Sequence, residues 1–199
     1  MPTAPCLIVV ASRHGHTRRI AEHVAGVLER TGLRSEIVAV ADAHAPSLAD
    51  RALVIAGGSV HAGHHDRLLV RWLRTHAGDL ERVPLGVFSA SLSAGDRGGP
   101  GAEQAEALLR ALLEDAGVHP ARSTTVAGAL QYRAYGRLTR WTMRRIARRK
   151  GLPTDPRRDV ELTDWAAMDA FATGLADLAL AVRPARDVDE AAPEPSPAA

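Results

Sequence analysis

The 199-residue sequence predicts an α/β fold of three layers, in which helices cover both faces of a parallel β-sheet. Short apolar runs alternate with segments of helical periodicity, a rhythm typical of β-α-β units. The first run, residues 6–11, has an uninterrupted apolar character and is expected to be a strand buried on both faces. The loops that follow the runs differ in composition, and this difference predicts the order of the strands.

Each strand is predicted from a short run rich in apolar and β-branched residues. The five expected strands are residues 6–11, 36–40, 52–58, 85–90 and 124–129. Helices are expected over residues 17–31, 66–76, 101–116 and 164–180. Asp164 stands where the last helix begins, and its side chain is expected to cap that helix.

The loops after the first, third and fourth strands are rich in glycine and small residues, whereas residues 41–46 after the second strand are not. In sheets of this kind, ligands bind beyond the carboxyl ends of the strands, near the point where the strand order reverses. Strands one, three and four would then line one site. This arrangement corresponds to a five-stranded sheet of order 2-1-3-4-5.

The loop at residues 12–17, Ser-Arg-His-Gly-His-Thr, joins the first strand directly to a helix. Loop N–H groups and the positive end of the helix favour an anion there, and the hydroxyls of Ser12 and Thr17 can donate to its oxygens. The chain lacks both the G-x-x-x-x-G-K-[ST] pattern and the dinucleotide pattern G-x-G-x-x-G. A ligand with a single phosphate, such as FMN, fits so short a loop.

Composition predicts one domain over residues 1–182. The chain is 46% hydrophobic, which suffices for a core, and its formal net charge is +2. Cys6 is the single cysteine, so no internal disulfide can form and a cytoplasmic location is expected. No run reaches the roughly 20 apolar residues of a membrane span, and the N-terminus does not resemble a signal peptide. Residues 183–199, rich in Pro, Ala and acidic side chains, are expected to form a disordered tail.

Residues 131–160 form a basic insertion before the last helix, and residues 135–150 within it are predicted to be helical. Between residues 133 and 158 the chain carries ten cationic side chains and a single acidic one, Asp155. Such a segment can lie on an anionic membrane surface, at about 1 kcal/mol per cation, or hold the carboxylates of a substrate. The alternative is that the basic segment is a solvated surface and has no specific function. Nucleic-acid binding is disfavoured, because no nucleic-acid-binding motif accompanies the charge.

Three loops and a later segment resemble the flavodoxin-like superfamily and, more closely, the menaquinone-dependent protoporphyrinogen IX dehydrogenase family. In the loops, the resemblance is carried by residues 12–17, by Gly-Gly-Ser-Val-His-Ala-Gly-His at 57–64 and by Phe-Ser-Ala-Ser-Leu at 88–92. The more specific part comprises Ala-Gly-Ala-Leu-Gln-Tyr at 127–132, the basic helix, and residues 155–165, which end in Thr-Asp-Trp. The resemblance covers roughly residues 5–180.

The resemblance implies a flavodoxin-like sandwich that binds one FMN. It also implies that the chain oxidises protoporphyrinogen IX to protoporphyrin IX, a step of heme biosynthesis, with a quinone as electron acceptor. Because the quinone is lipid-soluble, a peripheral position on the inner face of the cell membrane agrees with this activity.

FMN would carry the redox chemistry, so no side chain is assigned a certain catalytic role, and His64 is a candidate proton acceptor. The implied cofactor-binding residues are Ser12, Arg13, His14, Gly15, His16, Thr17, Gly58, Ser59, Val60, His61, Gly63, Ser89, Ala90, Ser91, Leu92 and Gly95. The candidates for contact with substrate or membrane are Tyr132, Arg133, Arg137, Arg140 and Arg144.

Other interpretations stay open at this point. An NAD(P)H:quinone reductase, an electron-transfer flavodoxin and a binding domain without flavin would all share the fold. A serine hydrolase centred on Ser59 is disfavoured, because residues 57–61 lack the final glycine of G-x-S-x-G. A metal site at His61, His64 and His65 is disfavoured too, because adjacent loop histidines are a weak pattern. The sequence leaves the formation of homo-oligomers open.

Overall fold

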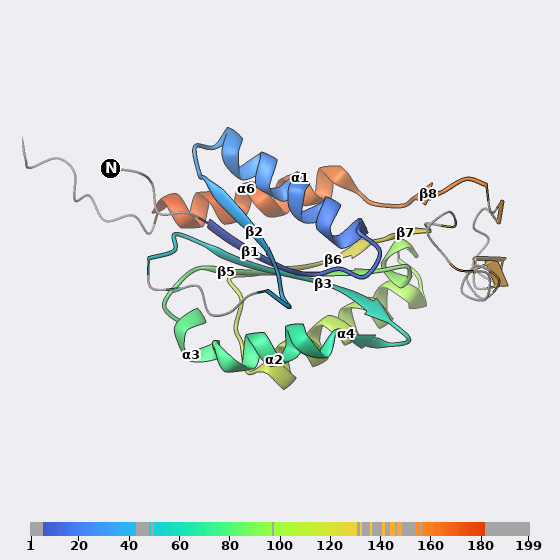
Figure 1. Ribbon diagram of the computed structural model, residues 1–199, viewed down its shortest axis with the longest axis horizontal. Coiled ribbons are helices and arrows are strands. Elements are labelled where there is room, and N and C mark those ends of the chain that lie inside the picture. The colour runs from blue at the N-terminus through green and yellow to red at the C-terminus, as the bar shows by residue number, and fades with distance from the viewer. Residues whose placement is uncertain are drawn as a thin grey trace, which may run out of the picture.

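Strand β1 (Cys6–Ala11) is buried along its whole length, as its uninterrupted apolar character predicts. In the computed structural model it lies within a mainly parallel sheet that has helices on both faces (Figure 1). The predicted three-layer α/β fold is therefore confirmed. The residues that the structure describes are 6–42, 48, 50–96, 98–130, 132, 136, 141, 144, 145, 147, 148, 154, 155 and 157–181.

The other long strands run parallel to β1 or to its neighbours. They are β2 (Ser35–Ala39), β3 (Val54–His61), β5 (Leu85–Ser91) and β6 (Arg122–Ala127). The sheet order is β2-β1-β3-β5-β6, and every neighbouring pair along it is parallel. These are the five predicted strands in chain order, so the order 2-1-3-4-5 is confirmed.

Two groups of helices cover the two faces of the sheet (Figure 1). One face carries α1 (His16–Arg30) and α6 (Trp165–Ala181), and the other carries α2 (Arg67–Thr75), α3 (Ala77–Leu80) and α4 (Pro100–Ala116). Helix α1 buries Ile20, Val24 and Leu28 completely, because these side chains recur one turn apart. The Asp164 carboxylate accepts a hydrogen bond from the Ala167 amide at 3.1 Å, which confirms the predicted cap of α6.

The apolar layer on the α1 and α6 face comes close to the backbone of the sheet. Phe88 and Leu175 are both buried in it. A Cβ atom at Gly57 would lie 2.1 Å from Phe88 Cζ, and one at Gly86 would lie 2.4 Å from Leu175 Cδ1. Both glycines are therefore required by packing, because any side chain there would displace a core residue.

Strand β3 continues to His61, past the end predicted at Gly58, and then turns into a short antiparallel strand, β4 (His64–His65). The turn residues Ala62 and Gly63 both have positive φ, 50° and 80°, as a two-residue type I′ turn requires. The segment predicted as a glycine-rich loop is therefore a hairpin, closed by the pairing of its two strands.

A second antiparallel pair joins the two ends of the basic insertion. It consists of β7 (Ala129–Leu130) and β8 (Val160–Glu161). The prediction of one strand over 124–129 was wrong at its end, because Gly128 separates β6 from β7. Two-residue strands carry too few side chains to form a recognisable pattern, so this pair depends on contacts between distant segments.

The described part of the insertion has a small core of its own. Tyr132 is completely buried beside Leu130 and Ala147. The described residues between 141 and 148 have helical backbone, in agreement with the predicted helix. Arg133, Arg137 and Arg140, and the predicted disordered tail, lie outside the described residues. Within the part of the chain that is described, no helix has both the length and the apolar character needed to cross a bilayer.

Candidate functional site

The carboxyl ends of β1, β3 and β5 lie side by side at one edge of the sheet. The register pairs Ala11 with Gly58 and Ser59 with Ala90, so the segments that follow these strands begin close together. This edge is where ligands of doubly wound sheets bind. The structure thus brings together residues 12–17, the β3–β4 hairpin and the segment after Ser91.

Residues 12–17 form the tight loop that leads into α1. Gly15, the N-cap of α1, has φ 83°, a left-handed conformation that glycine adopts without strain. Gly15 offers no capping side chain and the first turn has no acidic residue, so no side chain of these residues occupies the amides of His16 and Thr17. Ser12 Oγ accepts a hydrogen bond from the Arg18 amide at 3.3 Å, and Thr17 is buried in the same turn. The backbone amides at the start of α1 and the hydroxyls of Ser12 and Thr17 are donors that fit the phosphate of FMN.

His16 turns its side chain away from that loop. Its Nε2 lies 2.8 Å from Thr163 Oγ1, and the Thr163 hydroxyl donates to the Ala127 carbonyl at 2.9 Å. Because that hydroxyl has a single hydrogen, Nε2 of His16 must be the donor to Thr163. Burial lowers the pKa of His16. The negative charge of Glu161 opposes this shift, and the positive charge of Arg19 adds to it. A neutral His16 therefore joins α1 to the segment before α6, and its backbone amide alone remains for a ligand.

Three of the predicted site residues interact at the hairpin. Ser59 Oγ and His61 Nε2 are 2.9 Å apart, and the rings of His61 and His14 meet edge-on with centroids 5.8 Å apart. Burial, together with the neighbouring Arg13 and His14, lowers the pKa of His61. The ring of His61 is therefore neutral at pH 7 and can act as a polar contact without adding charge.

His65, which was not predicted as a site residue, holds the hairpin against β5. It pairs with Val60, and its Nε2 lies 2.8 Å from the hydroxyl of Ser89, which is 1% exposed. Burial lowers the pKa of His65 to about 4. A Cβ atom at Gly58 would lie 2.5 Å from Leu69 Cδ2. Gly58 and Ser89, both predicted to contact the cofactor, are thus part of the packed support of the hairpin.

The loop predicted after the fourth strand begins only where β5 ends. Ser89, Ala90 and Ser91 belong to the strand and are buried. The Ser91 hydroxyl accepts a hydrogen bond from the Ala94 amide at 3.1 Å and so shapes the short 3₁₀ helix η1 (Ser93–Gly95). Leu92 packs against the small core of the insertion. Residues 92–95 therefore face the edge, with the basic insertion beside them.

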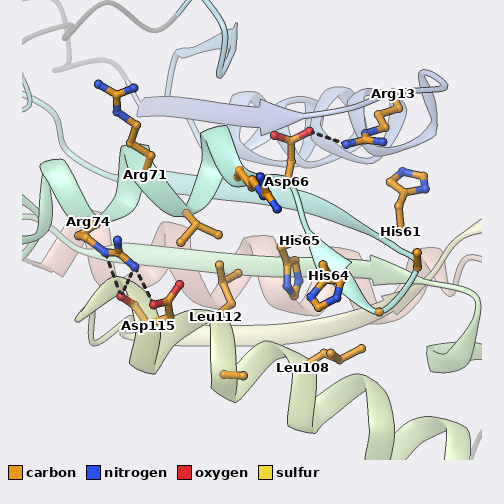
Figure 2. Close-up of a pocket in the computed structure, with 15 residues that line it drawn as sticks. Arg13, His61, His64, His65, Asp66, Arg71, Arg74, Leu108, Leu112 and Asp115 are labelled. Atoms are coloured by element: carbon orange, nitrogen blue, oxygen red, sulfur yellow. Dashed lines mark hydrogen bonds and ion pairs between the residues drawn. The ribbon is translucent and has the colours of Figure 1, made fainter.

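Arg13 extends from the first loop to the start of α2, where its Nη2 lies 3.5 Å from Asp66 Oδ2 (Figure 2). Asp66 is also the N-cap of α2, since it accepts a hydrogen bond from the Leu68 amide at 2.9 Å. Asp66 and Thr163 were not predicted as site residues. Asp66 does precede a helical pattern, which suggests a cap, but its ion pair with Arg13 depends on the fold, as does the position of Thr163.

Comparisons with known proteins agree with this architecture. The sequence model of the flavodoxin domain family matches residues 7–157. A relative from Leishmania major named protoporphyrinogen IX dehydrogenase (quinone) is 30% identical over 180 residues, which cover 90% of this chain and 78% of the relative. A relative of the same name from Escherichia coli K12 is 29% identical over 172 residues, which cover 86% of this chain and 94% of the relative.

Among solved structures, the fold is similar to that of a flavodoxin from Streptococcus pneumoniae, with a TM-score of 0.51. The two chains are 16% identical, and the alignment covers 89% of this chain and 99% of that flavodoxin. At this level of identity the likeness concerns the fold alone.

Proposed function

We propose that this chain, which belongs to the flavodoxin domain family, oxidises protoporphyrinogen IX to protoporphyrin IX with FMN as cofactor and a quinone as acceptor. The observation that carries the proposal is the meeting of three loops at the carboxyl edge of the sheet, where the start of α1 offers amides to a phosphate. The names of the relatives from L. major and E. coli supply the substrate and the acceptor.

Each part of the edge would have its own task. FMN supplies the redox chemistry when bound, and the protein orients it. The amides of residues 14–17 and the Ser12 hydroxyl would hold the phosphate, while Arg13 adds a positive charge nearby. The hairpin and residues 92–95 would line the flat ring system. His64 is exposed, and its side chain has no hydrogen bond to another described residue, so it can accept a proton lost by the substrate.

We also propose that the basic insertion rests on an anionic membrane surface, which would place the site near a lipid-soluble quinone. Trp141 is 60% exposed, and the guanidinium of Arg145 lies 6.0 Å from the centroid of its ring. An exposed indole beside cations is typical of segments that lie in a membrane interface. Arg144, another of the predicted contact residues, donates from its Nε to the Thr154 carbonyl at 3.0 Å within the insertion.

The absorbance of the purified protein tests the proposed function. We expect the bands of oxidised flavin after loading with FMN. Under anaerobic conditions protoporphyrinogen IX should bleach these bands, and a quinone should restore them. NADPH serves as the matched alternative donor.

The other outcomes identify the rival functions. Bleaching by NADPH but not by protoporphyrinogen IX would indicate an NAD(P)H:quinone reductase. A flavin that neither donor reduces, but that exchanges electrons with a redox partner protein, would indicate an electron-transfer flavodoxin. Failure to bind FMN in excess would leave a binding domain without flavin.

A further inference from the structure

A groove of about 930 Å³ extends from the hairpin along the helices of the α2 and α4 face (Figure 2). Its size lies within the range of small-molecule sites, about 300–1,000 Å³. The groove shares Arg13 and the residues of the hairpin with the proposed FMN edge. A ligand in it would therefore reach that edge at one end.

One wall of the groove is basic. Arg67, Arg71 and Arg74 recur on α2 at the spacing i, i+4, i+7, so they form a stripe along the helix. Arg74 is held by Asp115 on α4, with 2.6 Å between Nη2 and Oδ1. Arg67 and Arg71 are exposed and have no ion pair or side-chain hydrogen bond with another described residue. Two guanidinium groups at this rim are therefore available to an anion.

The opposite wall is apolar. Helix α4 contributes Leu108, Ala111 and Leu112 at the spacing i, i+3, i+4, and Val70 adds to this surface from α2. The whole lining contains four arginines and two aspartates, so its fixed charge is positive. A wall of this kind covers the apolar body of a ligand, while the arginines bind its acidic groups in paired hydrogen bonds.

The hairpin closes the end of the groove near the FMN edge. Its histidines His61, His64 and His65 face this end, and the half-buried His65 is held by the hydroxyl of Ser89. This end is polar. Among the described residues that line it, Asp66 is the acidic one, and it is paired with Arg13. An apolar and anionic ligand can thus extend from the arginine stripe to the FMN edge.

We infer that the groove between α2 and α4 binds a molecule with an apolar body and carboxylate groups, and that Arg67 and Arg71 bind the carboxylates. This inference rests on the proposed function, under which the occupant is the tetrapyrrole substrate with its two propionate groups. It differs from the membrane role of the basic insertion and assigns the carboxylates to α2.

The inference is tested by titrating the FMN-loaded protein with protoporphyrin IX. The absorbance of the porphyrin monitors its binding. We expect Arg67→Ala/Arg71→Ala to raise the dissociation constant about tenfold. A matched variant, Arg34→Ala/Arg82→Ala, removes two exposed arginines outside the groove and should bind as the wild type does. The dimethyl ester of protoporphyrin IX, which lacks free carboxylates, should bind equally to all three proteins.

The FMN content of each variant separates this inference from the proposed function. If FMN is bound and protoporphyrinogen IX is oxidised, but Arg67→Ala/Arg71→Ala leaves porphyrin binding unchanged, the groove assignment is wrong and the proposed function stands. If no FMN binds, yet porphyrin binding still depends on the two arginines, the proposed function fails and the dicarboxylate site stands. A dimer that dissociates in Arg67→Ala/Arg71→Ala would assign the groove to self-association and overturn the inference.

Discussion

His16 Nε2 donates a hydrogen bond of 2.8 Å to Thr163 Oγ1, although the two residues are 147 positions apart in the sequence. Thr163 in turn donates to the carbonyl of Ala127, the last residue of β6. Nearby, Arg19 Nη1 lies 2.9 Å from Glu161 Oε2. These contacts hold the start of α1, and with it the predicted phosphate loop, against both ends of the basic insertion.

Thr163→Val should destabilise the protein by about 2 kcal/mol, because it leaves the His16 N–H and the Ala127 carbonyl without partners in a partly buried place. Urea denaturation monitored by circular dichroism measures this change. Thr163→Ser keeps the hydroxyl and is expected to stay near the wild type. Equal stability of the valine variant and the wild type would show that the cluster does not contribute.

His65 predicts a loss of stability in acid. Burial lowers the pKa of the folded side chain to about 4, from the ordinary value of 6.5. Between these values the unfolded chain binds a proton that the folded chain does not, so the free energy of unfolding falls as the pH falls through this window. The loss amounts to about 3 kcal/mol at most.

Urea denaturation at pH 7 and pH 4.5 tests this dependence. His65→Gln removes the titrating group and should lose less stability on acidification than the wild type. His119→Gln, at an exposed position outside the site, should lose as much as the wild type. The same loss in all three proteins would contradict the assignment to His65.

Gly15 and Gly32 form a matched pair for testing the phosphate loop. They stand at opposite ends of α1 with φ of 83° and 84°, and a Cβ atom at either would meet no atom within 4 Å. Alanine at either position should strain the backbone by about 1 kcal/mol. Only Gly15 orients the amides that would bind phosphate, so Gly15→Ala should weaken FMN binding about tenfold.

Quenching of FMN fluorescence gives both dissociation constants, and urea denaturation gives both stabilities. Gly32→Ala should lose similar stability but bind FMN as the wild type does. Equal weakening of FMN binding in the two variants would mean that the effect comes from the helix as a whole.

Arg145→Glu/Arg148→Glu should weaken binding to vesicles that contain anionic lipid at least tenfold, since each cation near such a surface is worth about 1 kcal/mol. Both side chains are exposed on the described part of the insertion. Arg34→Glu/Arg82→Glu makes the same change of charge elsewhere and is the control. Vesicle sedimentation measures binding, and equal retention of both variants would remove the membrane role.

The general plan of this protein could be predicted because it depends on local patterns. The continuous apolar run at residues 6–11 forms a buried strand, and Asp164 caps the last helix, as short-range chemistry requires. The contrast between loops rich in small residues and the loop at 41–46 predicted the strand order, because ligand sites form where strand order reverses.

What could not be predicted depends on partners that are distant in the sequence. Gly58 was predicted to contact the cofactor, yet the side chain of Leu69 occupies the space beside it, as that of Phe88 does beside Gly57. The hairpin at Ala62 and Gly63 required two positive φ angles, which a loop rich in histidine did not suggest. The side chain of His16 was predicted to bind the cofactor but binds Thr163 for the same reason, since Thr163 lies on a segment distant in the sequence.

The amino-acid sequence by itself thus determined the succession of the long strands and helices, the sheet order and the place of the predicted phosphate loop, because periodicity, capping and turn composition act within a few residues. The tertiary structure alone decided where side chains point, which histidines stay neutral and that α2 and α4 enclose a groove. These properties arise from burial and from contacts between segments that meet only when the sheet has formed.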